Sequence, residues 1–260
     1  MSNPRLMNGM GSPQSVYSTS TTQEHAIGTR GILPDGRVYY YTRNGTTSAL
    51  AKGSVLAAAA IVGNHSNQTV AAAADVTAGA TSVVANIGGT LAGVGVYNEG
   101  YFAITDGTAQ GDIYQIREFP GGASSTDITV EIYGSVQTSA GGSDTFTLIQ
   151  NLYSNPIVHP ASKAGVPVGV PNAALAAATT AATATAAAVD ATYGWVQTWG
   201  PCLVLMDETS GFTVGTAAVS GEGEAGAVEL ADAAGELRIG TMMDAAVDTE
   251  YQPVDLRIRP

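Results

Sequence analysis

Apolar and polar residues alternate along several short stretches of this chain, which is the pattern of half-buried β-strands. Isoleucine or valine occupies every second position in 128–132, and Val254, Leu256 and Ile258 alternate with charged residues near the end of the chain. Glycine-containing pairs such as Asp106-Gly107 lie between such stretches and favour tight turns. The spacing of strands and turns therefore predicts a mainly β protein with short antiparallel strands.

The same pattern divides the chain into three parts. Residues 1–30 are rich in Asn, Ser, Thr, Met and Gly and keep no strand or helix period, which predicts a flexible N-terminal arm. Residues 31–155 are predicted to form a first β module with a short alanine-rich helix near 50–62. Residues 156–260 are predicted to form a second β module, with an Ala/Thr-rich loop at 173–189 whose alanines also allow a short helix. We expect two small antiparallel β-barrel or sandwich modules preceded by an extended arm.

The composition is dominated by small residues, and the charge is strongly acidic. The 260 residues include 32 glycines, and 22 acidic against 10 basic side chains give a net charge of −12. This balance disfavours nucleic-acid binding, since phosphates require clustered Lys and Arg. Residues 1–65 carry five basic and two acidic side chains, net +3, so this end would dock on an acidic surface. Alternatively, the uneven charge has no binding role, and the acidic remainder of the chain only keeps the protein soluble. Without an apolar run typical of a secretory signal or membrane span, we expect synthesis in a cytoplasm.

Motifs of common enzymes are not found in the sequence. It has no G-x-S-x-G elbow, no P-loop and no H-E-x-x-H segment. The three histidines, His25, His65 and His159, are far apart, and we expect them at the surface. Residues 221–226 match G-x-G-x-x-G, but their two glutamates would repel a phosphate, which predicts an acidic surface turn. We expect no catalytic residues, no metal and no cofactor.

Two pairs of carboxylates and one thiol are the remaining candidates for chemistry. Glycoside hydrolysis needs only two carboxylates, which Asp106 and Asp112, or Asp207 and Glu208, would supply, although Asp-Gly pairs are more often turns. Cys202 is the single cysteine, which excludes an intrachain disulfide and a Cys-based zinc site. Its apolar neighbours predict a buried strand in which the thiol acts as a small apolar side chain.

Large aromatic residues gather shortly before this cysteine. Two strands are predicted here, over 195–199 and 202–206, and unbroken alternation would place Tyr193, Trp195 and Trp199 on one face. Such a stripe belongs more often to a core or a subunit interface than to a sugar-binding platform.

Four stretches together carry a resemblance to a known class of protein. They are 35–40 (DGRVYY), 100–116, 167–170 (PVGV) with the strand 193–200 (YGWVQTWG) to which it leads, and 239–251 before the closing strand. This pattern resembles virion structural proteins of tailed bacteriophages, particularly the capsid decoration or cement proteins that bind outside an assembled head.

The resemblance implies a non-enzymatic protein of the virion exterior, made in the host cytoplasm, that stabilises or decorates the capsid shell. Its partners would be the major capsid protein and further copies of itself, as a homotrimer at local three-fold positions, with no cofactor, nucleic acid or membrane. The alternative is a phage fibre component or a receptor-binding, carbohydrate-binding adhesin. Exposed aromatic side chains at a distal tip would favour that alternative.

The resemblance also suggests where the chain makes contact. The arm would order on the shell, and deletion of residues 1–28 should leave the β modules folded while weakening attachment. Tyr193, Trp195 and Trp199 are the predicted subunit-interface aromatics. The predicted capsid-binding residues of the arm are Arg5, Met7, Met10, Tyr17 and Arg30.

Overall fold

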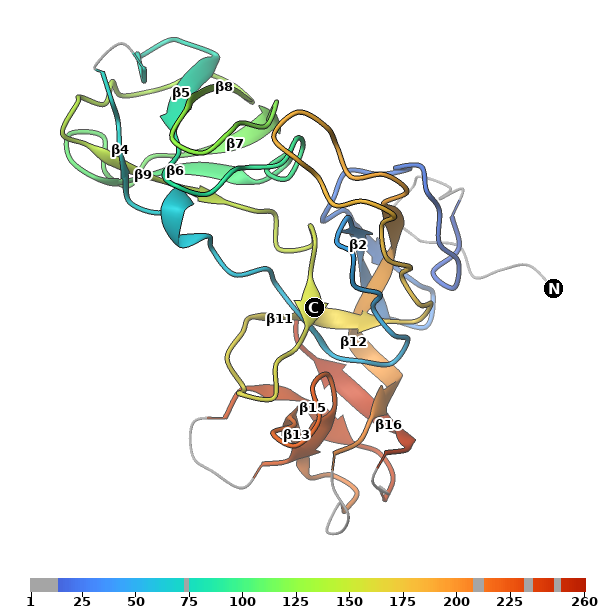
Figure 1. Cartoon of the computed structure of the whole chain (residues 1–260). Coiled ribbons are helices and arrows are strands. Elements are labelled where there is room, and N and C mark those ends of the chain that lie inside the picture. Colours follow the sequence, from blue (N-terminus) through green and yellow to red (C-terminus); the bar gives the residue numbers. More distant parts are fainter. Residues whose placement is uncertain (1–13, 73–74, 208–212, 232–235, 246–248) are drawn as a thin grey trace.

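Two curled antiparallel sheets, each forming a half-barrel, make up the computed structural model of the chain (Figure 1). Strands account for 40% of it and helices for 1%, which confirms the mainly β fold class. The structure describes residues 14–72, 75–207, 213–231, 236–245 and 249–260.

The larger sheet has ten strands, and both ends of the chain contribute to it. Its main order is β10-β3-β11-β12-β16-β15-β13-β14, and β2 pairs with both β12 and β1. The strands are β1 (Arg30–Ile32), β2 (Val38–Asn44), β3 (Leu56–Ala57), β10 (Ile157–Val158), β11 (Pro167–Pro171), β12 (Thr192–Leu205), β13 (Ala217–Ser220), β14 (Val228–Leu230), β15 (Arg238–Met242) and β16 (Tyr251–Arg257).

The smaller sheet is an insertion between β3 and β10, and we call it the inserted sheet. The chain leaves the larger sheet after β3, passes the 3-10 helix η1 (Gly63–His65), and returns at β10, whose Ile157 pairs with Ala57 of β3. The inserted sheet has the order β4-β9-β6-β7-β8-β5. Its strands are β4 (Gln68–Thr69), β5 (Ser82–Asn86), β6 (Tyr101–Asp106), β7 (Ile113–Glu118), β8 (Asp127–Ile132) and β9 (Thr145–Ile149).

This topology corrects the predicted division into modules 31–155 and 156–260. Strands β2 and β3 precede the inserted sheet in sequence but pair with strands that follow it: β2 with β12, and β3 with β10 and β11. The boundary near residue 155 therefore does not separate two sheets. The pattern of turns locates strands, but it carries no information on which distant strands pair.

The predicted short helix near 50–62 is also wrong. This segment contains a turn followed by β3, and its backbone is bonded to distant segments: Leu50 N–H donates to the carbonyl of Leu175, and Val55 N–H to that of Gly226. Gly53 has φ +79°, which interrupts any helix. Alanine is the strongest helix former, but intrinsic propensity is small compared with tertiary interactions, so pairing with neighbouring strands overrides it here.

Apolar side chains form three separate clusters. The core of the inserted sheet lies entirely between Val70 and Leu148 and contains the stacked rings of Phe102 and Phe146, 4.9 Å apart. The larger sheet has one cluster around Trp195 and a second that includes the β12, β15 and β16 residues of the C-terminal part. Each fully buried large apolar side chain stabilises its cluster by about 1.5–3 kcal/mol.

The N-terminal arm is shorter than predicted. Val16 is buried in the cluster around Trp195, Ser20 pairs with Tyr193, and Gln14 Nε2 donates to the Tyr193 carbonyl. Residues 14–29 therefore belong to the body of the larger sheet, where an apolar anchor and main-chain pairing fix them. Residues 1–13 lie outside the described part.

The Ala/Thr-rich segment 173–189, for which the sequence allowed a loop or a short helix, is a loop without helix in the described structure. A bridge between Thr180 and Val189 closes it, and Val94 N–H of the inserted unit donates to the Thr183 carbonyl at 2.8 Å. Figure 1 shows this yellow-orange loop reaching from the larger sheet to the inserted one. Its small side chains allow the close approach, since Gly93 lies directly against Ala182.

Candidate functional site

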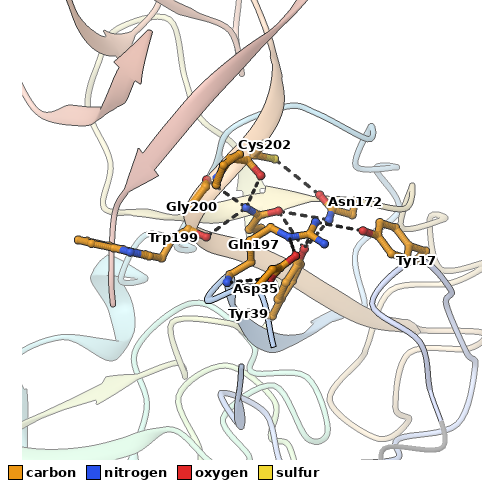
Figure 2. A network of polar contacts seen from close by, with 10 residues as sticks. Tyr17, Asp35, Tyr39, Asn172, Gln197, Trp199, Gly200 and Cys202 are labelled. Atoms are coloured by element: carbon orange, nitrogen blue, oxygen red, sulfur yellow. Dashed lines mark hydrogen bonds and ion pairs between the residues drawn. The ribbon is translucent and has the colours of Figure 1, made fainter. Parts of the chain in front are cut away.

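A buried glutamine organises the middle of β12. Tyr39 Oη donates to Gln197 Oε1 at 3.0 Å, and Asn172 Nδ2 donates to the same oxygen at 3.3 Å. Gln197 Nε2 lies 2.8–3.1 Å from three carbonyl oxygens that follow it in the chain, and Figure 2 shows the side chain at the centre of these contacts. The three carbonyls belong to Trp199, Gly200 and Pro201. Gln197 therefore fixes the strand where its pairing changes from β2 to β16.

Arg37 extends this polar network to the surface. Its Nη1 donates to Tyr39 Oη and Tyr17 Oη, both at 3.0 Å, and its Nε pairs with Asp35 Oδ2 at 2.8 Å. Burial disfavours the charged guanidinium, but hydrogen bonds to Tyr17 and Asp35 outweigh it and raise the pKa of Arg37. Burial also disfavours the charged form of Asp35 and would raise its pKa, but the hydrogen bonds from Arg37 outweigh burial, so the pKa of Asp35 is lowered. The pair is thus ionised at neutral pH and positions the Tyr17 ring.

Beside the network lies a surface groove made of two adjoining cavities. The first, of about 320 Å³, is lined by Tyr17, Arg37 and other residues of the network, and also by three prolines and Leu203. The second, of about 310 Å³, shares Lys52 and Leu203 with the first and adds Gly53 and Tyr251. The prolines are Pro171, Pro201 and Pro253. We call the two cavities together the groove.

The walls of the groove are exposed apolar side chains. Leu203 is 54% exposed and Tyr251 47% exposed, and both point away from the core, whereas Cys202 and Val204 face inward. The Tyr251 ring lies directly over Gly53, where an added Cβ would be 2.5 Å from Cε1. Exposed apolar side chains gathered at one place typically mark an interaction surface.

Cys202 lies at the bottom of the groove as an inert thiol. The side chain is buried, its Sγ is 3.6 Å from Asn172 Oδ1, and burial raises the pKa of the thiol to about 12. The thiol is therefore protonated at neutral pH. This confirms the prediction that Cys202 acts as a small apolar residue of a buried strand.

The three predicted interface aromatics do not form one accessible stripe. Trp195 is only 2% exposed and packs edge-on against Tyr41, with centroids 5.1 Å apart, so its predicted place in a subunit interface is wrong. A register shift between Gln197 and Trp199 breaks the alternation on which the stripe depended. Trp199 lies under the Arg257 guanidinium, 4.7 Å from the ring centroid.

Tyr193 and Trp199 are partly exposed, and their predicted interface role stays a prediction. Of the predicted arm residues, Tyr17 lies at the groove and Arg30 begins β1, where it pairs with Tyr40. Arg5, Met7 and Met10 lie outside the described residues.

Sequence reasoning missed most of the groove. Lys52, Leu203 and Tyr251 come from three distant segments, and no local pattern joins them. One indication was present in the run 202–206, where apolar residues occupy both alternating positions. Such a run places apolar side chains on both faces of a strand, and the outward face then needs a cover.

The glycine-rich turn is filled by the chain itself. Gly223 and Glu224 N–H groups donate to Asp207 Oδ2 at 2.6 and 2.8 Å, so a carboxylate of the protein occupies the position that a ligand anion would take. This confirms the predicted acidic surface turn at 221–226. Asp106, the last residue of β6, likewise accepts from the adjacent Gly107 N–H where the following turn begins.

The expected surface position of the histidines is wrong for two of the three. His65 is buried, with Nδ1 2.6 Å from Tyr97 Oη, and His159 is buried beside Pro160. Each ring nitrogen of His65 has a polar neighbour, so the imidazole can be buried without leaving a nitrogen unpaired. In the parts of the chain that the structure describes, no three or more His, Cys, Asp or Glu side chains are grouped as metal ligands.

A second polar site lies where the N-terminal segment meets the inserted sheet. Glu99 accepts hydrogen bonds from Ile27 N–H and from Gln23 Nε2, and Arg43 Nη1 donates to the Gly95 carbonyl at 3.3 Å. A cavity of about 230 Å³ lies between these residues. Burial raises the pKa of Glu99, although its hydrogen bonds and the charge of Arg43 oppose the shift. This contact, which we call the junction, joins the two sheets.

Comparison of the chain with models of known protein families, with curated proteins and with solved structures finds no match. Among the described residues, none belongs to a helix with the length and apolar character needed to cross a membrane.

Proposed function

We propose that this chain is a non-enzymatic virion structural protein that binds the outside of a tailed-phage head and stabilises or decorates the shell. Its partner would be the major capsid protein. The chain would attach to the shell as a symmetric homotrimer. The observation that carries the proposal is the groove. Exposed leucine and tyrosine side chains line it on the larger sheet, which is an arrangement typical of a binding surface.

The N-terminal segment supports the same role. Tyr17, a predicted contact residue of this segment, lines the groove and is held there by its hydrogen bond to Arg37. Arg5, Met7 and Met10 would add contacts to the shell. Many copies on one particle turn a weak contact of each copy into a lasting attachment, because neighbouring contacts raise the effective concentration.

The alternative, a fibre component or a carbohydrate-binding adhesin, has less support from the geometry. It would use the aromatic side chains of β12 as a sugar platform. Trp195 is buried and Arg257 covers Trp199, so these side chains do not present such a platform.

The first test is the number of copies in purified virions. Quantitative mass spectrometry of gradient-purified particles, normalised to the major shell protein, should give a ratio near that of the shell protein. A ratio lower by an order of magnitude or more would instead indicate a fibre, vertex or tail component. Complete absence from particles would reject the virion role.

A second test uses the corrected boundary of the arm. Deletion of residues 1–13 should leave the fold intact and weaken binding to heads that lack the protein, measured by co-sedimentation. Deletion of residues 1–28 should in addition destabilise the protein, since it removes the buried Val16 and the Ile27 N–H that bonds to Glu99. Undiminished head binding by the shorter deletion would show that the arm has no role in attachment.

A further inference from the structure

The groove has the shape and chemistry of a site for an extended chain. Its two cavities share Lys52 and Leu203, so they adjoin and are lined by residues from several separate segments of the chain. The residues that line it include three prolines, two tyrosines and Leu203. Flat, rigid surfaces of this kind bind extended peptide segments in several recognition modules, since neither partner loses much conformational freedom.

The charge at the groove selects among such segments. Lys52 is exposed, and its amine forms no ion pair with any residue that the structure describes. The other cation of the groove, Arg37, is already paired with Asp35. In a chain of net charge −12, an unpaired cation beside an apolar groove favours a ligand with a carboxylate at that position.

We propose that the groove binds an extended segment of a partner protein that carries proline, leucine or tyrosine side chains and an acidic residue that meets Lys52. The inference rests on the proposed function only for the source of the segment, which would be the shell protein. Two other occupants fit the charge less well. Residues 1–13 contain Arg5 and no acidic residue, and a second copy brings a further net charge of −12.

The test selects a displayed library of random twelve-residue peptides on the full-length protein. We expect enriched peptides that combine proline, leucine or tyrosine with at least one aspartate or glutamate. The most enriched peptide, made synthetically, should bind at least tenfold more weakly to Leu203→Ser and to Lys52→Glu in fluorescence anisotropy. Binding should also weaken as salt rises, because an exposed ion pair is screened.

A matched control separates the groove from apolar surface in general. Leu91, on the inserted unit, is 50% exposed, close to the 54% of Leu203, so Leu91→Ser removes a similar side chain at a distant place. Leu91→Ser should leave peptide binding unchanged. Failure to enrich any peptide family, equal binding by Leu203→Ser, or enriched peptides without an acidic residue would each overturn the proposal.

Two further results would assign the groove to another occupant and thereby also overturn the proposal. Self-association in light scattering that Leu203→Ser abolishes would assign it to a second copy. Peptide binding that appears only after deletion of residues 1–13 would assign it to the protein's own N-terminus. Equal head binding by wild type and Leu203→Ser, without peptide binding, would reject this inference alone. Peptide binding without head binding would reject only the proposed function.

Discussion

At the scale of single residues, Gln197 determines the course of β12. Its amide meets two donors and three carbonyl oxygens in a fully buried position, so its side chain has no unused hydrogen-bonding capacity. Gly200 follows with φ +84°, a conformation that favours glycine. These two residues together allow one strand to continue past its change of partner.

Replacing this glutamine should therefore destabilise the fold. Gln197→Ala would remove the acceptor of the Tyr39 hydroxyl proton and the amide that donates to the carbonyls of residues 199–201, and we expect a loss of about 2–4 kcal/mol in the free energy of unfolding, from roughly 1–3 kcal/mol for each buried group that loses its partner. Urea unfolding followed by tryptophan fluorescence measures it. Gln137→Ala, at an exposed glutamine, serves as the control and should change stability by less than about 0.5 kcal/mol. A similar small change for both variants would contradict the role of Gln197.

At the scale of elements, local patterns located strands but not their partners. The alternation over 128–132 corresponds to β8, and that of the closing residues corresponds to β16. Such strands can be located from a few residues, because successive side chains of a strand point alternately into the core and toward solvent. The predicted strands 195–199 and 202–206 are one continuous strand, β12, since Gln197 and Gly200 bridge the interval between them. The pairing of β3 with β10 joins positions about a hundred residues apart, which no local pattern can indicate.

The candidate site was predictable only in part, for the same reason. Tyr17 was named as a contact residue, but as part of a flexible arm, while the Arg37 hydrogen bond that positions it depends on the folded sheet. Trp195 was placed at an interface because large aromatics are common there, and the structure buries it within the chain instead. Sequence alone did not distinguish the two environments.

The junction is an element-scale contact whose strength depends on pH. The pKa of Glu99 is raised by burial above the ordinary 4.5, so the folded protein binds the proton more tightly than the unfolded chain does. Its contribution to stability is therefore greatest at low pH and decreases as pH rises through and above 4.5. We expect Glu99→Gln, which keeps an acceptor for Ile27 N–H without the charge, to gain stability relative to wild type between pH 4.5 and 7.

Urea unfolding of both proteins across this pH range checks the expectation, and the difference between the two curves isolates residue 99 from other titrating groups. A difference that stays constant, or that changes in favour of wild type as pH rises, would contradict it.

At the scale of the whole molecule, the inserted sheet has a core of its own. All buried members of that core lie between Val70 and Leu148, and contacts such as those of Glu99 and Val94 attach the unit to the larger sheet. We expect a fragment of residues 60–151 to fold alone, with a cooperative thermal transition and dispersed amide signals in NMR spectra. A fragment with the spectrum of an unfolded chain would show that the larger sheet is needed for its stability.

The pairing of Ala57 with Ile157 has a consequence for how this architecture can change over time. Directly paired residues of antiparallel strands have Cα atoms about 4.5–5.5 Å apart, so the inserted unit enters and leaves the larger sheet at almost the same point. A domain with closely spaced termini therefore fits this position without altering the pairing of β3 with β10, although it would not supply the contacts that Glu99 makes with Ile27 and Val94 with Thr183. The larger sheet thus offers a place for domain exchange, by recombination between genomes or by deliberate grafting of an enzyme or antigen, once those contacts are rebuilt.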